Sequence, residues 1–399
     1  MKGDERASRT NGANAPRRED LETQILAFMA ELDWRRDEHR FESLALGLFR
    51  FQYGACEPYR RYCDSLGLHP GAVARANDVP AVPTGAFKEF DLRCFPAEQT
   101  ILTFRTSGTA TERRGALHLD TLRLYETSLL ASLRRCFLTD LCGRRPVMRF
   151  LAPGAAVAPD SSLSHMFASL AVAEGGEESG FDLGPDGLDL ATLGRAVESA
   201  RRRAEPIVLA GTSFAFVHFL DAIDAAEATQ SSTWRLPQGS RVLETGGFKG
   251  RSREVPRERL RAELGASFGI PASSILNQYG MTELGSQFYD STLVDPSGPR
   301  RKLVPPWTRV RCVDPDSGRD MPIGEVGVVV IHDLANSGSV AAIQTADLGR
   351  MIPSQTGDGF DVLGRFEGAE QRGCSIAVDS MLGGGETRSR SESGAEPMR

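Results

Sequence analysis

The feature that most constrains this chain is an alternation of strand-like and helix-like segments through its middle. Short apolar runs typical of buried strands occupy residues 206–211, 241–247 and 326–333. Helical patterns occupy residues 213–223 and 255–269, the second ending at a candidate glycine cap. Alternation of this kind favours an α/β fold with largely parallel sheets flanked by helices. Further helices are predicted over residues 21–32, 41–53 and 120–137, with Asp120 as a candidate cap for the last.

Composition places the chain among globular proteins. Its 399 residues are 40% hydrophobic and 25% charged, which is enough to bury a substantial core. With 47 basic and 53 acidic residues, the net charge of −6 argues against a protein that holds nucleic-acid phosphates. No run of about 20 apolar residues predicts a membrane span, and the charged N-terminus does not resemble a secretory signal. Seven scattered cysteines, an odd number, predict a reducing, cytoplasmic compartment.

The first candidate site is a loop rich in hydroxyl groups and glycine. The sequence TFRTSGTATERRGALHLD, residues 103–120, places Thr106, Ser107, Gly108 and Thr109 after a short apolar stretch. Hydroxyls and open backbone N–H groups suit a phosphate cradle, and the two arginines at 113 and 114 add positive charge. The alternative is an ordinary surface turn, and the motif alone leaves both open.

The second candidate site is NQYGMTELG, residues 277–285. Tyr279 beside Gly280 and Met281 can lay its ring on a flat base, and Thr282 offers a hydroxyl. Glu283 offers a carboxylate for a hard cation such as Mg²⁺. The alternative is a strand end followed by a turn with a solvated glutamate.

The third candidate site joins two short motifs near residues 345–350 and 363–375. Asp347 is placed to accept hydrogen bonds from two ribose hydroxyls, and Arg365 to reach a ribose or a phosphate. Taken singly, each motif is also typical of a hairpin turn. Upstream, Gly246 and Gly247 close the strand at 241–247 and are candidates for holding a base.

These motifs occur in an order that resembles the adenylate-forming superfamily. NQYGMTE is similar to the N-x-Y-G-x-T-E motif of that superfamily at every fixed position. VPAVPTGAFKEFDLR, residues 79–93, resembles the Pro-Thr-x-x-x-Lys approach of the phenylacetate-ligase branch and supplies Lys88. With Arg372-Gly373-Cys374-Ser375 near the end, the chain most resembles the acyl-protein synthetases of bacterial luminescence, the fatty-acid–luciferin-component ligases.

That resemblance implies a function and a set of roles. It implies ATP and Mg²⁺ as cofactors, a fatty acid as substrate, and an acyl-AMP intermediate whose acyl group passes to Cys374 and on to a partner reductase. Glu283 would bind Mg²⁺, and the positive charge at the phosphates would come from Lys88, Lys249, Arg113 or Arg365. The other six cysteines are expected to lie in the core.

The resemblance also suggests a domain organisation. We expect disordered tails at 1–18 and 383–399, an adenylate-forming domain over 19–364, and a short segment over 365–382 that carries the acyl-accepting cysteine. From Arg365 to Arg399 the chain has 35 residues, so a full second domain is not expected there. The Pro- and Arg-rich segment 297–311 is expected to be an exposed connection.

Two alternatives to the acyl-protein thioester remain open at this point. One keeps the adenylation and changes the acyl acceptor to CoA, a carrier protein or an amine. The other is an inactive nucleotide-binding scaffold subunit, which the short C-terminus and the altered phosphate loop allow.

Overall fold

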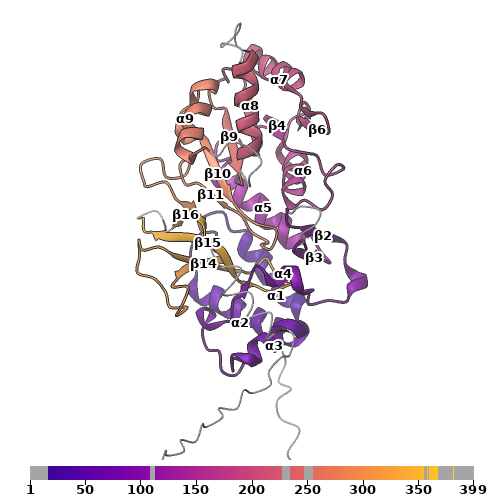
Figure 1. Cartoon of the computed structure of the whole chain (residues 1–399), viewed down its shortest axis with the longest axis vertical. Helices are drawn as coiled ribbons and strands as arrows, with labels where there is room; N and C mark the ends of the chain where they lie inside the picture. Colours follow the sequence, from indigo (N-terminus) through magenta and orange to yellow (C-terminus); the bar gives the residue numbers. More distant parts are fainter. Residues whose placement is uncertain are drawn as a thin grey trace, which may run out of the picture.

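The computed structural model describes residues 17–107, 113–226, 234–246, 255–354, 357, 359–366 and 381. In it the predicted α/β fold is confirmed, with two large sheets and helices on their faces (Figure 1). Within the described residues, no helix is both long enough and apolar enough to cross a membrane.

The first large sheet is largely parallel and forms one end of the molecule (Figure 1). Its strand order is β11-β10-β9-β8-β4-β5, with only β11 antiparallel to its neighbour. The strands are β4 (Val147–Leu151), β5 (Gly180–Phe181), β8 (Ile207–Thr212), β9 (Arg241–Thr245), β10 (Ile275–Tyr279) and β11 (Phe288–Tyr289).

Helices cover both faces of this sheet because its central strands are apolar on both sides. The side chains of α5 (Arg123–Cys136) and α6 (Ser162–Glu174) pack on one face. Those of α7 (Leu190–Arg203), α8 (Ser213–Ala226) and α9 (Arg257–Phe268) pack on the other. The strands and helices expected between residues 206 and 269 are therefore confirmed.

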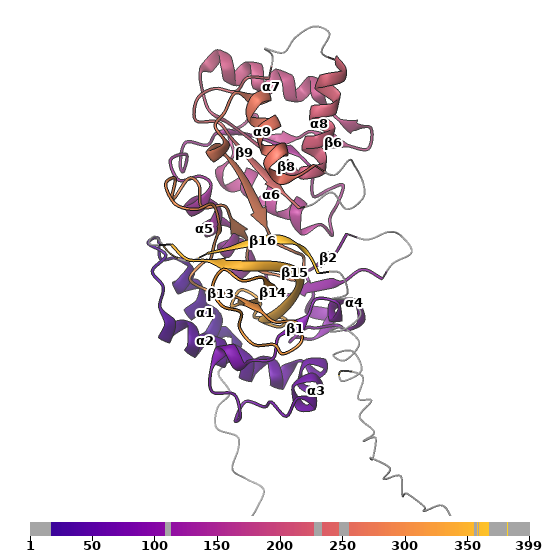
Figure 2. The ribbon, with the colours of Figure 1, turned by 60° about the vertical axis from the view of Figure 1, so that its left-hand side comes forward.

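The second large sheet is antiparallel and lies beside the carboxyl ends of the first (Figure 2). Its order is β12-β16-β15-β14-β13, and β1 (Val82–Pro83) pairs with β15 in parallel. Its strands are β12 (Lys302–Leu303), β13 (Thr308–Val313), β14 (Gly327–Asp333), β15 (Ala342–Ile352) and β16 (Gly359–Arg365).

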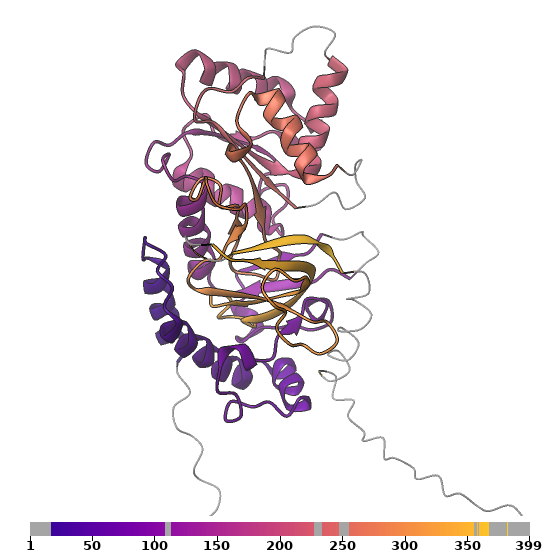
Figure 3. The ribbon, with the colours of Figure 1, turned by 90° about the vertical axis from the view of Figure 1, so that its left-hand side faces the viewer.

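The N-terminal helices pack against this second sheet (Figure 3). They are α1 (Arg18–Met29), α2 (Glu38–Ala55) and α3 (Glu57–Ser65). Leu21, Ile25 and Phe28 of α1 are buried, but Leu32 is 90% exposed beyond the end of that helix. The prediction of a helix over residues 21–32 is therefore confirmed for its first part and wrong for its last turn.

The remaining elements are short. They are α4 (Ala86–Glu89), the hairpin strands β2 (Leu102–Arg105) and β3 (Ala116–Leu119), the pair β6 (Leu183–Gly184) and β7 (Gly187–Leu188), and the 3-10 turns η1 (Ala76–Asp78), η2 (Ala97–Gln99) and η3 (Ala272–Ser274).

Asp120 does not cap the helix that follows it. α5 begins at Arg123, and no side chain caps it from its N-cap residue, Leu122. The Asp120 carboxylate instead accepts hydrogen bonds from both terminal nitrogens of Arg18 on α1, at 2.6 and 2.8 Å. A two-bond arginine–carboxylate pair holds a carboxylate more strongly than a single cap bond, so the long-range partner prevails.

Segment 297–311 is not the exposed connection that its composition suggested. It contributes β12 and the first residues of β13, and Arg301, Lys302 and Trp307 are buried. Burial is possible because the charges are paired: Arg301 lies 2.8 Å from Asp295, and Lys302 lies 2.8 Å from Asp290.

The prediction that the six cysteines other than Cys374 lie in the core is wrong for one of them, because Cys142 is exposed.

The glycine cap of α9 generates a test of the local structure. Gly269 has φ +66° and caps the helix, and a Cβ there would lie 2.9 Å from Cδ of Arg235. We expect Gly269→Ala to lower the free energy of unfolding by about 1 kcal/mol. Gly194→Ala, inside α7 with only an ordinary 3.6 Å contact to Trp234, should raise it by up to about 1 kcal/mol. Chemical denaturation measures both, and equal effects of the two would contradict this assignment.

Candidate active site

The predicted base- and ribose-binding residues meet where the two large sheets face each other. Tyr279 is the last residue of β10, and its hydroxyl donates a 2.8 Å hydrogen bond to Oδ2 of Asp347 on β15. Arg365, on β16, is the register partner of Asp347, with its Nε 4.0 Å from Oδ1. Three residues separated by up to 86 positions (365 − 279) are thus brought to one place.

Burial and a carboxylate define the electrostatics at Tyr279. Burial, and then the negative charge of Asp347, raise the pKa of the Tyr279 hydroxyl well above its ordinary value. The hydroxyl therefore stays protonated and acts as a donor to Asp347. The Tyr279 ring packs edge-on against the Phe360 ring of β16, with centroids 5.7 Å apart, which fixes its direction.

Gly246 lies at the carboxyl end of the neighbouring strand, β9. Its φ of +77° is in the left-handed region, where a side chain would be strained, and a Cβ there would meet no atom of the described residues within 4 Å. The backbone at this point is therefore open to a ligand. In open α/β sheets, ligands bind at the carboxyl ends of parallel strands, which is where Gly246 and Tyr279 lie.

The turn after β10 holds the rest of the second motif. Gly280, Met281 and Thr282 are partly exposed, whereas Glu283 is buried. The backbone carbonyl of Glu283 accepts a 2.7 Å hydrogen bond from Nδ2 of Asn336, so the turn is fixed to the loop between β14 and β15. The glutamate is therefore held in a defined place, unlike the solvated residue of the alternative interpretation.

Thr106 closes the base of the loop between β2 and β3. Its N–H donates to the carbonyl of Gly115 at 2.9 Å, and its Oγ1 accepts from the N–H of Gly115 at 2.8 Å. Ser107 is exposed beside it, and Gly108 and Thr109 lie outside the described residues. The hydroxyl of Thr106 thus has a structural partner in addition to the phosphate predicted for it.

The two arginines of this loop are both paired with carboxylates. Arg113 lies 2.8 Å from Glu89 of α4, and Arg114 lies 2.8 Å from Asp160. The pair formed by Arg113 holds α4 beside the loop. Lys88, the residue before Glu89, is half-buried on the same short helix. Lys88 therefore lies in the neighbourhood of the predicted phosphate loop, as the resemblance implied.

Four candidate residues fall outside the described residues, in addition to those of the loop. They are Gly247, Lys249, Arg372 and Cys374. Their predicted roles stay predictions.

Sequence reasoning missed a buried polar network beneath the site. Oε1 of Glu244, on β9, accepts a 2.8 Å hydrogen bond from Ser213, and its other oxygen accepts from Nδ2 of Asn277 on β10. All three side chains are buried. The available signal was a glutamate directly after Val242 and Leu243 in the predicted buried strand, where an unpaired charge would be costly.

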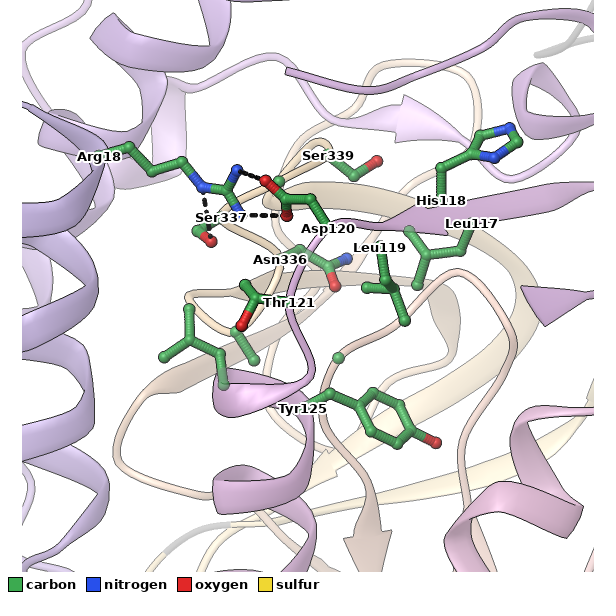
Figure 4. Close-up of a pocket in the computed structure, with 14 residues that line it drawn as sticks. Arg18, Leu117, His118, Leu119, Asp120, Thr121, Tyr125, Asn336, Ser337 and Ser339 are labelled. Atoms are coloured by element: carbon green, nitrogen blue, oxygen red, sulfur yellow. Dashed lines mark hydrogen bonds and ion pairs between the residues drawn. The ribbon is translucent and has the colours of Figure 1, made fainter. Parts of the chain in front are cut away.

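A separate pocket lies on the other side of the loop after Glu283. Arg18, His118, Asp120, Tyr125 and Ser337 are among its lining residues, and Arg18 bridges Asp120 and Ser337 at its rim (Figure 4). Of the predicted nucleotide-binding residues that the structure describes, none lines this pocket. We therefore do not assign it to the nucleotide.

Comparison with known proteins agrees with the resemblance. Residues 188–383 match the family described as acyl-protein synthetase, LuxE. The chain is 22% identical over 375 residues to the long-chain-fatty-acid–luciferin-component ligase of Aliivibrio fischeri, covering 90% of this chain and 94% of that protein. It is 20% identical over 341 residues to the Vibrio harveyi protein of the same name, covering 84% and 86%. Over residues 188–383, and in its similarity to these two ligases, the chain resembles the acyl-protein synthetases.

Solved structures of similar fold support the architecture of this chain. An open conformation of 2-hydroxyisobutyryl-CoA ligase, in complex with 2-HIB-AMP and CoA, superposes with a TM-score of 0.58 over 82% of this chain and 75% of that one, at 15% identity. The same ligase in its postadenylation state gives 0.59 over 83% and 69%. The likeness confirms the adenylate-forming fold predicted from the motifs.

The base of the loop between β2 and β3 can be tested on its own. Thr106→Val removes the oxygen that accepts the N–H of buried Gly115. An unsatisfied buried donor costs about 1–3 kcal/mol, so we expect the free energy of unfolding to fall by that amount. Thr106→Ser keeps the acceptor and should change it by less than about 1 kcal/mol. Urea unfolding measures both variants, and equal losses would show that the hydroxyl is not the stabilising group.

Proposed function

We propose that this chain uses ATP to activate a carboxylic acid, a long-chain fatty acid in the first instance, and then transfers the acyl group to a cysteine thiol. The observation that carries the proposal is the contact between Tyr279 and Asp347 at the carboxyl edge of the parallel sheet. It joins two of the predicted nucleotide-binding residues in a chain that is similar to proteins named long-chain-fatty-acid–luciferin-component ligases.

In the first half-reaction, a carboxylate oxygen of the acid attacks the α-phosphorus of ATP. The bond from that phosphorus to the oxygen shared with the β-phosphate breaks, and pyrophosphate leaves. Both reactants are anions, so catalysis depends on positioning and on neutralising charge. We assign the phosphates to the loop of Thr106, Ser107, Gly108 and Thr109, with Lys88 as the nearby cation.

The nucleoside would be held by the residues that the two sheets bring together. Tyr279 and the backbone at Gly246 and Gly247 would contact the base. Asp347 would accept from the ribose hydroxyls, and Arg365, which is largely exposed, could turn to the ribose or a phosphate. The Tyr279 hydroxyl occupies one acceptor position of the Asp347 carboxylate. A carboxylate has about four such positions, so others remain for the ribose hydroxyls.

The residues present fit a magnesium ion that is bound chiefly by phosphates and water. Mg²⁺ usually takes one or two protein carboxylates in such sites, and Glu283 supplies one from a turn held by Asn336. Among the described residues, no group of three or more histidine, cysteine, aspartate or glutamate side chains forms a metal cage. When bound, the ion would offset the charge of the phosphates.

In the second half-reaction, a thiolate attacks the acyl carbonyl carbon, and the bond from that carbon to the AMP oxygen breaks, so AMP leaves. We propose Cys374 as the thiol. It follows Phe366 by eight residues (374 − 366), and the N–H of Phe366 donates to the carbonyl of Ala346, next to Asp347. Eight extended residues span at most about 28 Å, so Cys374 stays within that distance of an anchor beside the site.

A second anchor follows Cys374. Met381 is fully buried and belongs to the main hydrophobic core, and it lies seven residues after Cys374 (381 − 374). An acyl-accepting thiol would thus be tethered on both sides. We further propose a reducing cytoplasm, where a free thiol persists, and an acyl reductase as the partner that takes the acyl group.

The alternatives differ in the acyl acceptor or in activity. The likeness to a CoA ligase is a likeness of fold at 15% identity and does not favour CoA as acceptor. Exchange of pyrophosphate into ATP, driven by a carboxylic acid, would separate an adenylating enzyme from a scaffold. A screen of fatty acids by chain length in this assay identifies the substrate, and exchange with no acid at all would contradict the proposal.

Glu283→Gln tests the magnesium ligand. We expect the pyrophosphate exchange rate at fixed Mg²⁺ to fall, and the Mg²⁺ concentration for half-maximal rate to rise about 10- to 100-fold, the scale seen when metal sites are altered. The circular dichroism spectrum should be unchanged. An unchanged Mg²⁺ dependence would show that Glu283 is not a ligand.

Cys374→Ser tests the acyl acceptor. With radiolabelled fatty acid and ATP, the wild type should acquire a hydroxylamine-labile label on the protein, and Cys374→Ser should not. Pyrophosphate exchange should persist in the variant, because adenylation precedes the thiol step. Cys142→Ser is the matched control, since Cys142 is the exposed cysteine of the described residues. A label that survives Cys374→Ser would place the acyl group elsewhere.

A further inference from the structure

A buried lysine lies where the two large sheets join. Lys302, on β12, is 3% exposed, and its ammonium group donates to three oxygens. These are the backbone oxygen of Asn277 at 2.7 Å, Oδ1 of Asn277 at 2.5 Å and Oδ1 of Asp290 at 2.8 Å. An ammonium group has three donors, so all of them are used.

Charge pairing makes this burial possible. Burial lowers the pKa of Lys302, and Asp290 opposes that effect. Burial works against the charge of Asp290 in turn, but the positive charges of Lys302 and Arg300 outweigh it and hold the pKa of Asp290 below its ordinary value. Arg300 lies 2.6 Å from the second oxygen of Asp290, which also accepts from the N–H of Asn277 at 2.9 Å.

Lys302 sets the orientation of the buried network that ends at the site. Because an ammonium group only donates, Oδ1 of Asn277 must face it, and Nδ2 of Asn277 is then directed to Glu244. The second oxygen of Glu244 accepts from Ser213, whose oxygen also lies 3.1 Å from the carbonyl oxygen of Gly246. The direction of each donor is thus fixed from Lys302 through Asn277 to Glu244, and the hydroxyl of Ser213 that donates to Glu244 lies beside the carbonyl of Gly246.

The same residue joins the two sheets. Asp290 follows β11 at the edge of the parallel sheet, and it forms an antiparallel bridge with Lys302 of the second sheet. Figure 1 shows β11 between β10 and β16. Asn277 precedes Tyr279 by two residues on β10, and the Phe360 partner of Lys302 packs against the Tyr279 ring. The distance between Tyr279 and Asp347 therefore depends on the bridge between Asp290 and Lys302.

The choice of lysine is itself informative. The chain has four lysines among its 47 basic residues, and Lys302 directly follows two arginines. The short contacts to three oxygens suit a compact ammonium group, whereas a planar guanidinium would need more room and a different set of acceptors. In a chain that otherwise uses arginine, the lysine at this position is explained by the geometry around it.

We propose that Lys302 is a positioning residue for the nucleotide: through Asn277 and Asp290 it sets the spacing of the two sheets and so holds Tyr279 and Asp347 in their binding arrangement. This rests on the proposed function for the identity of the nucleotide. Lys302 does not contact the reacting atoms in this account, and it acts on ATP affinity rather than on the chemistry.

The test uses the full-length protein and steady-state pyrophosphate exchange. Lys302→Met alone removes one partner of a buried ion pair and destabilises the fold, so Lys302→Met is also made together with Asp290→Asn, which removes both charges of the pair. Lys302→Arg tests whether charge alone suffices. Arg311→Met is the matched control, because Arg311 pairs with Asp320 at 2.6 Å on β13, at the opposite edge of the same sheet.

We expect the Lys302→Met, Asp290→Asn double variant to raise the KM for ATP about tenfold, with the KM for the acid changed less than about twofold. Lys302→Arg should resemble it, and Arg311→Met should resemble the wild type. If Lys302 acts through Asp347, the effects of changing both should not add. We therefore expect Lys302→Met with Asp290→Asn, introduced into the Asp347→Asn variant, to raise the KM for ATP by less than about threefold over Asp347→Asn alone.

Two results would overturn the proposal. One is a wild-type KM for ATP in the double variant, with any loss confined to thermal stability. The other is full additivity with Asp347→Asn. If the wild type shows no exchange with any acid, the proposed function fails instead, and Lys302 is then judged by calorimetric ATP affinity in the same variants. A wild type that binds no ATP would overturn both.

Discussion

The hydrogen bond from the Tyr279 hydroxyl to the Asp347 carboxylate links the parallel sheet to the antiparallel sheet at the edge where ligands of α/β proteins bind. Each partner is supplied by a different sheet, so neither sheet alone makes the site. Burial keeps the tyrosine protonated and the bond directed. The arrangement of the two sheets is therefore the condition on which the proposed nucleotide site depends.

That arrangement is held by charges that are buried in pairs. The pair of Lys302 and Asp290 lies at the junction of the two sheets. The pair of Arg301 and Asp295 lies on the chain beside it. Any one of these charges would be costly to bury without its partner. These pairs fix the orientation of the side chains more than they add to the free energy of unfolding, because any other orientation would leave a buried donor or acceptor without a partner. A polar network of this kind specifies one arrangement of the strands, and Gly246 and Tyr279 inherit their positions from it.

The sequence predicted the elements that follow from local pattern, and it missed those that follow from distant partners. Apolar periodicity located β8, β9, β14 and the helices between residues 206 and 269. By contrast, Asp120 looks like a cap until Arg18, 102 residues away, is known to hold it. Residues 297–311 look exposed until Asp290 and Asp295 are seen to pair with their charges. Such pairs leave no periodic signal.

The central claim is that the facing ends of β10 and β15 bind an adenylate. Calorimetric titration with a non-hydrolysable acyl-sulfamoyl adenosine, an analogue of acyl-AMP, measures this without relying on turnover or on the acyl acceptor. We expect saturable binding to the wild type at one site per chain, weakened at least about tenfold in Asp347→Ala, which loses the carboxylate proposed to accept from the ribose. Failure of the wild type to bind, or equal affinity in Asp347→Ala, would contradict it.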